Sequence, residues 1–342
     1  MATIRDVATR SGVSTATVSY VLNNGPRTVR PRTQARVLAA MRELNYHPSA
    51  MARGLNHKRV NSIGVVTLHS VQSPLENPYY RPVLSGIVDA ATRLRQSVNL
   101  FNGNVWESES SDFPVFCDGR CDGLLIFLPY VGNTLIPALK NQTAPFVIIG
   151  EGGTDPTVSS IDIDNVAVAR EIVGHLIGFG HRRIAHFQGA DYLLSSADRR
   201  LGYTEALAAA GIPFDPALVL TGDYETPSGY DLARTLFETA GEKPTAIFAA
   251  NDRMAVGAIK ALRELGLDVP RDVSVAGIDC SSHPDIPGTR LTSGDQHLMQ
   301  LGETAVTMVM ELINSAEPRI IKTLQPYDIV PGDTVGPPLI RA

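Results

Sequence analysis

The chain is 342 residues long, 44% of its residues are hydrophobic, and its formal net charge is −5. This length and composition are typical of a globular protein of two or three domains, and no apolar stretch approaches the roughly 20 residues that span a bilayer. The first residues, MATIRDVATR, lack the apolar core of a signal peptide, so we expect a cytoplasmic protein. Three cysteines, Cys117, Cys121 and Cys280, are odd in number and lack zinc-ligand spacing, which predicts free thiols and no metal site.

The charge is unevenly distributed along the chain. Residues 1–60 contain ten Lys and Arg, but only Asp6 and Glu43 as acidic residues, so their net charge is +8. The rest of the chain therefore carries −13. A small basic segment beside a large acidic one predicts that the segment binds a polyanion. Nucleic acid is the first candidate and a membrane surface is the second.

The basic segment has the pattern of a helix-turn-helix. A helix is predicted to begin after Thr3, which forms a capping box with Asp6. The turn Ser11-Gly12-Val13 ends this helix, and Ser14 caps a second one. Two short helices joined by a three-residue turn make a helix-turn-helix. The residues expected to face its core are Ile4, Val7, Ala8, Val18, Val21 and Leu22.

A third helix is predicted to begin at Pro31, because proline suits the first position of a helix. Its expected core residues are Val37, Leu38, Met41 and Leu44. Three helices of this size can close a small core.

The remaining residues alternate between short apolar runs and helical patterns. The predicted strands are 63–66, 124–127, 146–149, 184–187, 246–249 and 273–278. The predicted helices are 80–95, 166–179, 199–210, 226–240, 253–266 and 298–314. This alternation predicts parallel sheets covered by helices. In such sheets, ligands bind beyond the carboxyl ends of the strands. The polar residues that follow strands are Asn77, Tyr79, Ser195, Arg199, Asn251, Asp252 and Asp279.

The sequence lacks the motifs of common enzymes. It has no G-x-G-x-x-G after the first strand, no P-loop, no G-x-S-x-G and no H-E-x-x-H. His181 and His186 flank the start of a strand, where histidines are more often structural than catalytic. We expect no catalytic activity and no cofactor. A small-molecule-binding protein or enzyme with an incidental basic segment is the alternative from another functional class.

Several motifs together resemble the LacI family of bacterial regulators. The segments TIRDVATRSGVSTATVSYVLN and TQARVLAAMRELNYHPSAMARGL resemble its DNA-binding head and hinge, and HLIGFGHRRIAHFQG, PTAIFAANDRMAVGAIKAL and DVSVAGID resemble its effector-binding core. The resemblance implies a small all-α helix-turn-helix head at 1–46 and a hinge helix and linker at 47–60. It also implies an α/β core at 61–342, made of two parallel-sheet subdomains like those of periplasmic binding proteins. The chain is expected to cross between them more than once.

The resemblance also implies how the head meets DNA. The second helix enters the major groove, where Thr15, Ala16 and Tyr20 contact base edges. Relatives frequently carry Arg or His in place of Tyr20, so the forked contact to guanine is absent. Packing of Tyr20 on the head's own surface is the alternative. The hinge is implied to insert Leu55 into the minor groove, with a plain linker as the alternative. The full set of expected DNA contacts is Thr15, Ala16, Thr17, Tyr20, Asn23, Arg32, Ala52 and Leu55.

The effector is implied to lie between the two core subdomains. Arg199 and Asp279 resemble family residues that hold polar ligand groups, and Tyr224 stands at an aromatic position that can stack on a ring. Gly150 stands where relatives often have an Asp that reaches the ligand. Glu151 could replace that Asp, or the ligand could lack the matching hydroxyl. The expected effector contacts are Tyr79, Ser195, Arg199, Tyr224, Asn251 and Asp279.

We therefore expect a ligand-responsive repressor of genes for carbohydrate uptake or catabolism. Two heads must meet two half-sites, so a homodimer is expected on a near-palindromic double-stranded operator. No leucine heptad follows residue 320, which argues against a tetramer. A sugar-like effector is the commonest answer in the family, and a purine-like corepressor is the alternative. The sequence leaves open the effector, the operator and whether the ligand weakens or strengthens DNA binding.

Overall fold

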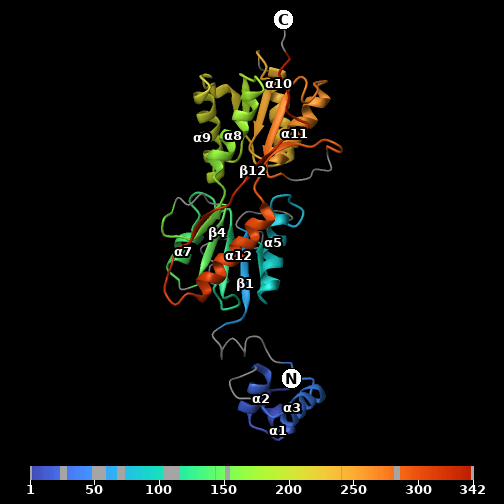
Figure 1. Ribbon diagram of the computed structural model, residues 1–342, viewed down its shortest axis with the longest axis vertical. Helices are drawn as coiled ribbons and strands as arrows, with labels where there is room; N and C mark the ends of the chain where they lie inside the picture. Colours follow the sequence, from blue (N-terminus) through green and yellow to red (C-terminus); the bar gives the residue numbers. More distant parts are fainter. Residues whose placement is uncertain are drawn as a thin grey trace. The chain divides into compact units, whose positions relative to one another are not determined.

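The computed structural model divides the chain into two units, Met1–Val60 and Asn61–Ala342 (Figure 1). The structure describes residues 2–23, 29–47, 59–67, 74–102, 116–142, 144–150, 155–239, 241–280 and 286–339. No helix in these ranges is long and apolar enough to cross a membrane.

In its described residues the first unit contains three helices, α1 (Ile4–Ser11), α2 (Thr15–Asn23) and α3 (Pro31–Glu43). The predicted capping box is present, because the Thr3 amide donates to the Asp6 carboxylate at 2.8 Å and the Asp6 amide donates to Thr3 Oγ1 at 3.4 Å. Gly12 ends α1 in the left-handed region at φ 64°, where glycine is favoured. The helix-turn-helix expected from the sequence is confirmed.

The three helices close a core around valines. Val7, Val18 and Val37, one from each helix, are fully buried. Leu38 was expected in this core and is instead 42% exposed. The buried stripe of α3 runs through Val37 and Ala40 and on to partly buried Met41 and Leu44. Leu38, one position after Val37, falls about 100° around the helix from that residue and so outside the stripe.

The part of the second unit that the structure describes contains two six-stranded sheets. Sheet A has the order β11-β5-β4-β3-β1-β2, and all of its strand pairs are parallel. Helices α5 (Tyr80–Arg93) and α12 (Leu298–Asn314) cover one face, and α7 (Leu135–Lys140) packs on the other. The strands are β1 (Ser62–Thr67), β2 (Ser97–Asn102), β3 (Gly123–Phe127), β4 (Phe146–Ile149), β5 (Ser160–Asp162) and β11 (Lys322–Leu324).

Sheet B has the order β12-β10-β9-β8-β6-β7 and is parallel except for β12, which pairs antiparallel with β10. Helices α8 (Asn165–Gly178) and α9 (Leu194–Ala209) cover one face, and α10 (Thr226–Thr239) and α11 (Asp252–Glu264) cover the other. The strands are β6 (Ile184–Gln188), β7 (Val219–Thr221), β8 (Ala246–Ala249), β9 (Ser274–Ile278), β10 (Thr292–Asp295) and β12 (Asp328–Val330), and a 3₁₀ turn (Pro216–Leu218) precedes β7. The expected pair of sheet subdomains is confirmed.

The chain crosses between the two sheets three times. It passes from β5 in sheet A to β6 in sheet B through α8, returns from β10 to α12 on sheet A, and passes again from β11 to β12. The crossing segments lie at 163–164, 296–297 and 325–327. Any rotation of one sheet against the other must therefore be absorbed by these three short segments.

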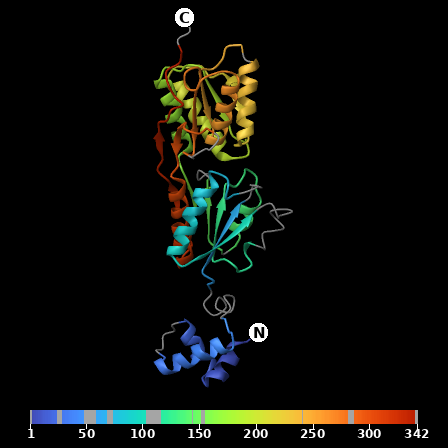
Figure 2. The ribbon, with the colours of Figure 1, turned by 90° about the vertical axis from the view of Figure 1, so that its right-hand side faces the viewer.

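Glycines allow the helix pair on sheet A to approach closely. A Cβ atom added to Gly86 of α5 would lie 1.9 Å from the Met299 carbonyl oxygen of α12, and one added to Gly302 of α12 would lie 2.1 Å from the Val83 carbonyl oxygen. The two helices lie side by side against sheet A (Figure 2). Because real Cβ atoms do not approach oxygen so closely, this packing requires glycine at both positions.

Candidate functional site

A cavity of about 680 Å³ opens at the carboxyl ends of strands from both sheets. Leu128 and Gly150 follow β3 and β4, Asp162 ends β5, and Asn251 and Asp279 lie just beyond β8 and β9. The volume is within the range of sites that enclose small ligands. The structure brings all six expected effector contacts to its lining, namely Tyr79, Ser195, Arg199, Tyr224, Asn251 and Asp279.

Arg199 is fixed inside the cavity by α8 and by strand β8. It lies on α9 and is only 5% exposed. Its Nε donates to Asn165 Oδ1 at 2.9 Å, and its Nη1 donates to the Ala250 carbonyl. Asn165 in turn donates from Nδ2 to Asp162 Oδ2 at 3.0 Å. A hydrogen-bonded row therefore runs from Arg199 in the sheet B subdomain to the end of β5 in sheet A.

Asp279 is a second buried carboxyl group in the lining of the cavity. It is 5% exposed, and Gln296 donates from Nε2 to its Oδ1 at 2.6 Å. Burial raises its pKa to about 8, repulsion from Asp252 adds to the rise, and Arg199 opposes it. Burial likewise raises the pKa of Asp162 to about 7. A ligand that forms hydrogen bonds with these carboxyl groups would therefore stabilise them.

The Tyr224 ring packs against Gly189. A Cβ atom on Gly189 would lie 2.0 Å from Cζ of the Tyr224 ring, so the ring occupies the space that a side chain at 189 would need. Tyr224 is held at φ 69°, and its hydroxyl lies 3.1 Å from Ser195 Oγ. Gly189 was not singled out from the sequence, because its role is visible only once the Tyr224 ring is placed.

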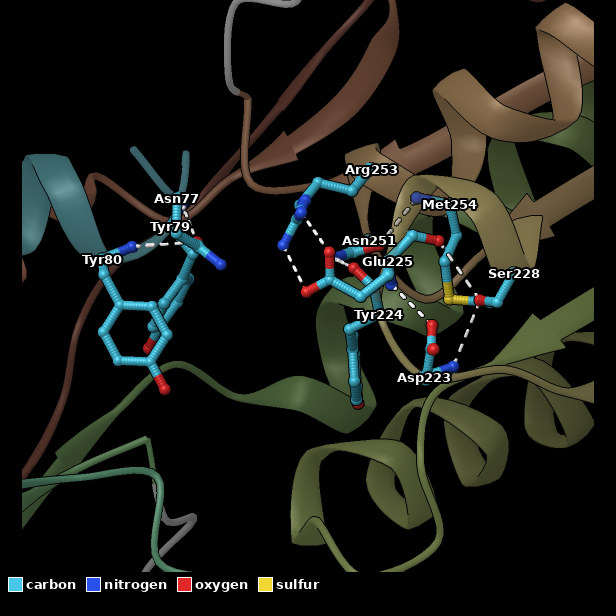
Figure 3. A network of polar contacts seen from close by, with 10 residues as sticks. All are labelled: Asn77, Tyr79, Tyr80, Asp223, Tyr224, Glu225, Ser228, Asn251, Arg253 and Met254. Carbon is cyan, nitrogen blue, oxygen red and sulfur yellow. Dashed lines mark hydrogen bonds and ion pairs between the residues drawn. The ribbon is translucent and has the colours of Figure 1, made fainter. Parts of the chain in front are cut away.

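Asn251 lines the cavity and also caps a helix. Its Oδ1 accepts from the Met254 amide at 3.0 Å and so caps α11, and its Nδ2 donates to the Tyr224 carbonyl at 3.0 Å. Asn77 binds backbone amides at the start of α5, where its Oδ1 accepts from the amides of Tyr79 and Tyr80 at 2.9 and 3.3 Å. Figure 3 shows these two groups facing each other.

Sequence reasoning missed several residues that line the cavity. Arg253 and Glu225 form an ion pair between α11 and the segment before α10 (Figure 3). Glu225 follows Tyr224, and Arg253 lies two residues after Asn251, so both could have been found as sequence neighbours of predicted residues. Asp162 ends a three-residue strand and Gln296 lies in a crossing segment, so neither followed a recognisable pattern. The missed residues are Glu76, Leu128, Asp162, Tyr192, Leu193, Asp223, Glu225, Arg253 and Gln296.

Glu151, considered above as a substitute ligand group, lies outside the described residues. Gly150 itself lines the cavity. Within the described ranges, no group of three or more His, Cys, Asp or Glu is placed to hold a metal ion. Cys117, Cys121 and Cys280 are free.

The expected DNA contacts in the first unit lie on α2 and α3. Thr15 and Ala16 are exposed in the first turn of α2, and Tyr20 is half-buried one turn later. Thr17 is also half-buried, with its hydroxyl 2.9 Å from Ser14 Oγ. Arg32 is exposed in the first turn of α3. Asn23 ends α2, and its side chain is not described. Ala52 and Leu55 lie outside the described residues.

Comparison with known proteins places both units in one family. Residues 3–49 match the bacterial regulatory proteins of the lacI family, and residues 173–335 match the periplasmic binding protein-like domain. The chain is 35% identical over 318 residues to the HTH-type transcriptional repressor PurR of Pectobacterium carotovorum, covering 92% of this chain and 91% of that protein. The same values hold for PurR of Yersinia pestis.

Solved structures agree with this comparison. The Lac repressor dimer bound to operator and the anti-inducer ONPF has a TM-score of 0.85 and 29% identity, covering 98% of this chain and 99% of that chain. A complex of the transcriptional regulator CelR with cellobiose has a TM-score of 0.75 and 28% identity, covering 98% and 100%. The chain belongs to the LacI family of bacterial regulatory proteins.

Proposed function

We propose that this protein is a dimeric transcriptional repressor whose affinity for a near-palindromic operator is set by a sugar-like effector in the cavity. The observation that carries the proposal is the row Arg199, Asn165 and Asp162, which joins side chains of both subdomains at one ligand-sized cavity. A ligand that contacts both subdomains favours one of their arrangements over another. If the ligand changes the affinity for the operator by some factor, operator binding must change the affinity for the ligand by the same factor.

The head supplies the DNA contacts in this proposal. Thr15 and Ala16 are small and exposed, so the backbone of α2 can approach base edges, with Ala16 against a thymine methyl. Tyr20 supplies one hydrogen bond and a ring contact, and Arg32 supplies a phosphate contact. The relative solved on operator DNA is described as a dimer, which supports two heads on two half-sites here.

A polyhydroxylated ligand suits the polar groups of the cavity. Carboxylates such as Asp279 accept hydrogen bonds from hydroxyl groups, and Arg199 offers donors. The Tyr224 ring offers a face for a sugar or other ring. The regulator CelR, which is similar to this chain, was solved with cellobiose, and genes for carbohydrate uptake or catabolism are the proposed targets.

A purine-like corepressor is the second candidate. It is favoured by the 35% identity to repressors named PurR. The cavity also offers tyrosine rings for stacking on a base. A thermal-shift screen of the full chain against sugars and nucleobases separates the two candidates, because a ligand at 100 times its dissociation constant adds about 2.7 kcal/mol to the free energy of unfolding.

Retention on DNA tests the regulatory function itself. Fluorescence anisotropy should show that the duplex upstream of the protein's own gene binds about 1,000-fold more tightly than a shuffled duplex of equal length and composition. Equal, weak binding of both duplexes would favour a small-molecule-binding protein or an enzyme whose basic segment is incidental.

A further inference from the structure

Leu128 and Gly150 form a matched pair at the edge of the cavity. They follow the neighbouring strands β3 and β4, and the Leu128 amide donates to the Ile149 carbonyl at 2.8 Å. A Cβ atom on Gly150 would lie 2.1 Å from Leu128 Cδ2. The leucine side chain therefore occupies the space that any side chain at 150 would need.

Both residues of the pair have unusual backbone conformations. Gly150 has φ 85° and Leu128 has φ 40°. Glycine adopts the left-handed region readily, but a bulky residue rarely does. Leu128 is thus held in an unfavourable conformation in which its side chain covers Gly150, at a position that lines the cavity.

Two tyrosines lie beside this pair and its strand. The Tyr79 hydroxyl oxygen lies 3.4 Å from the Cβ position of Gly150. The Tyr80 ring packs on Phe127, the last residue of β3, with ring centroids 5.3 Å apart. We call Tyr79, Tyr80, Leu128 and Gly150 the apolar wall. All four residues line the cavity.

The ionisable groups that line the cavity offer few positive charges to bind an anion. Its described lining contains five carboxyl groups, two guanidinium groups and no lysine or histidine. Arg253 is paired with Glu225, and Arg199 donates to Asn165 and to the Ala250 carbonyl. Arg253 is therefore already paired with a carboxylate, whereas Arg199 is held by two neutral acceptors and keeps N–H groups for a ligand. The carboxyl groups are Glu76, Asp162, Asp223, Glu225 and Asp279.

Two helix N-termini at the cavity are also occupied. Free N-terminal amides are common binding sites for phosphate. At α5 the amides of Tyr79 and Tyr80 donate to Asn77, and at α11 the Met254 amide donates to Asn251. A phosphate group that bound these amides would have to displace Asn77 or Asn251.

We propose that the effector is an uncharged molecule with hydroxyl groups at one end and a flat apolar group at the other, and that phosphorylated forms of it are rejected. The hydroxyl end faces Arg199 and Asp279, and the apolar group lies on the apolar wall. Leu128 is the specificity-determining residue for the apolar group. The inference rests on the proposed function, because it names the chemistry of the effector at the same site.

The test compares matched ligands on the full-length protein. Isothermal titration calorimetry measures binding of three forms in each of two series: free sugars, their nitrophenyl glycosides and their 6-phosphates, and ribose, nucleosides and nucleoside 5′-monophosphates. In at least one series the uncharged ring-bearing form should bind 10-fold or more tightly than the sugar alone, and 100-fold or more tightly than the phosphate ester. The series that shows this distinguishes a glycoside from a nucleoside.

Leu128→Asn is the matched variant. Asparagine is the non-glycine residue that best tolerates the left-handed region, so the backbone at 128 is preserved while the apolar side chain is lost. The preference for the ring-bearing form over the sugar alone should fall from 10-fold or more to within 3-fold. Leu324→Asn, at a leucine that is 62% exposed on β11 and does not line the cavity, should keep the full preference.

The inference is overturned if a phosphate ester binds as tightly as its uncharged form, or if Leu128→Asn keeps the full preference for the ring. Either result leaves the proposed function standing, because a ligand still binds the cavity. If no member of any series binds, and none changes operator affinity, the sugar-like effector of the proposed function is contradicted together with the inference.

Discussion

Asp279 and Gln296 join the end of β9 to the segment in which the chain crosses from sheet B to sheet A. Gln296 donates to the Asp279 carboxyl at 2.6 Å, and both side chains are almost fully buried at the cavity. The carboxyl group therefore keeps one strong partner while burial and Asp252 disfavour its charge. Such a group is costly for stability and is expected to serve ligand binding.

Asp279→Asn should weaken ligand binding and, at high pH, should increase the stability of the folded protein. The pKa of Asp279 is raised to about 8 from an ordinary 3.8, so the folded state binds a proton that the unfolded state lacks between those values. This contribution to stability is present below pH 4 and is lost as the pH rises through 8. Asparagine mimics the neutral form, so the free energy of unfolding of the variant relative to wild type should be several kcal/mol higher at pH 9 than at pH 4, since a pKa change of one unit corresponds to about 1.4 kcal/mol.

Urea unfolding of both proteins at the two pH values checks this, with Asp231→Asn, at an exposed aspartate on α10, as the control. Calorimetry should show effector affinity reduced at least 10-fold in Asp279→Asn only. A stability difference that is the same at pH 4 and pH 9 would contradict the assignment.

His186 should destabilise the folded protein as the pH falls. Its ring stacks between Tyr203 and Phe248, with centroids 5.2 and 4.7 Å away, and its Nε2 has no hydrogen-bond partner within the described part of the chain. Burial lowers its pKa to about 4. Because the unfolded state takes up a proton near pH 6.5 and the folded state does not, stability is lost as the pH falls from about 6.5 to 4, by about 3 kcal/mol in total.

The measurement is the difference in unfolding free energy between wild type and His186→Asn from pH 7 to pH 4. The difference is needed because Asp162 and Asp279 have raised pKa values and contribute with the opposite sign. His175→Asn, at a histidine that is partly exposed on α8, serves as the control. Parallel curves for wild type and His186→Asn would show that His186 is not the group responsible.

Tyr20→Ala and Arg32→Ala should weaken operator binding in different ways. If Tyr20 contacts a base edge, its loss should cost about 1–3 kcal/mol on the operator and relax the preference at one position per half-site, with little change in salt dependence. If Arg32 contacts a phosphate, its loss should weaken all duplexes alike and make the salt slope shallower by about one unit. Anisotropy titrations on a set of operator variants across a salt series measure both. Uniform weakening of every duplex by Tyr20→Ala would point instead to packing of Tyr20 on the head.

The fragment Asn61–Ala342 should fold without the head. All four of its apolar clusters are built from its own residues, and the head has a separate core. Sedimentation velocity should show a dimer, and calorimetry should give the same effector affinity as the full chain. An insoluble fragment, or one that no longer binds the effector, would show that the boundary at 60/61 is misplaced.

The long helices of the core were predictable from sequence, whereas the three-residue strands and the six-residue strand β2 were not. The helix predicted at 298–314 matches α12 at both ends, because a long amphipathic pattern marks it. Strands β5, β11 and β12 have three residues each, too few for an alternating pattern to stand out. Helix α9 begins at Leu194 and not at 199, because Leu193 lacks a side-chain cap that would have marked the start.

The site was predictable where a residue follows a buried apolar strand. Asn251 and Asp279 lie just beyond β8 and β9, and the cavity lies there. Asp162 and Gln296 lie at or next to the segments that cross between the two sheets. The position of these segments depends on how the two sheets are connected, and no local sequence pattern predicts it. Leu128 was missed for a different reason, since its contact with Gly150 depends on a left-handed backbone that the sequence does not reveal.

The central claim is that a ligand in this cavity controls operator binding, and Arg199→Ala tests it most directly. Operator affinity should be measured by anisotropy for wild type, Arg199→Ala and Arg200→Ala, each with and without the ligand that stabilises wild type. Arg200 is the matched control, since it is the next residue of α9 and is exposed. We predict that the ligand changes the operator affinity of wild type and Arg200→Ala by 5-fold or more and leaves Arg199→Ala unchanged, while all three bind operator within a few-fold without ligand. A full ligand response in Arg199→Ala would contradict the claim.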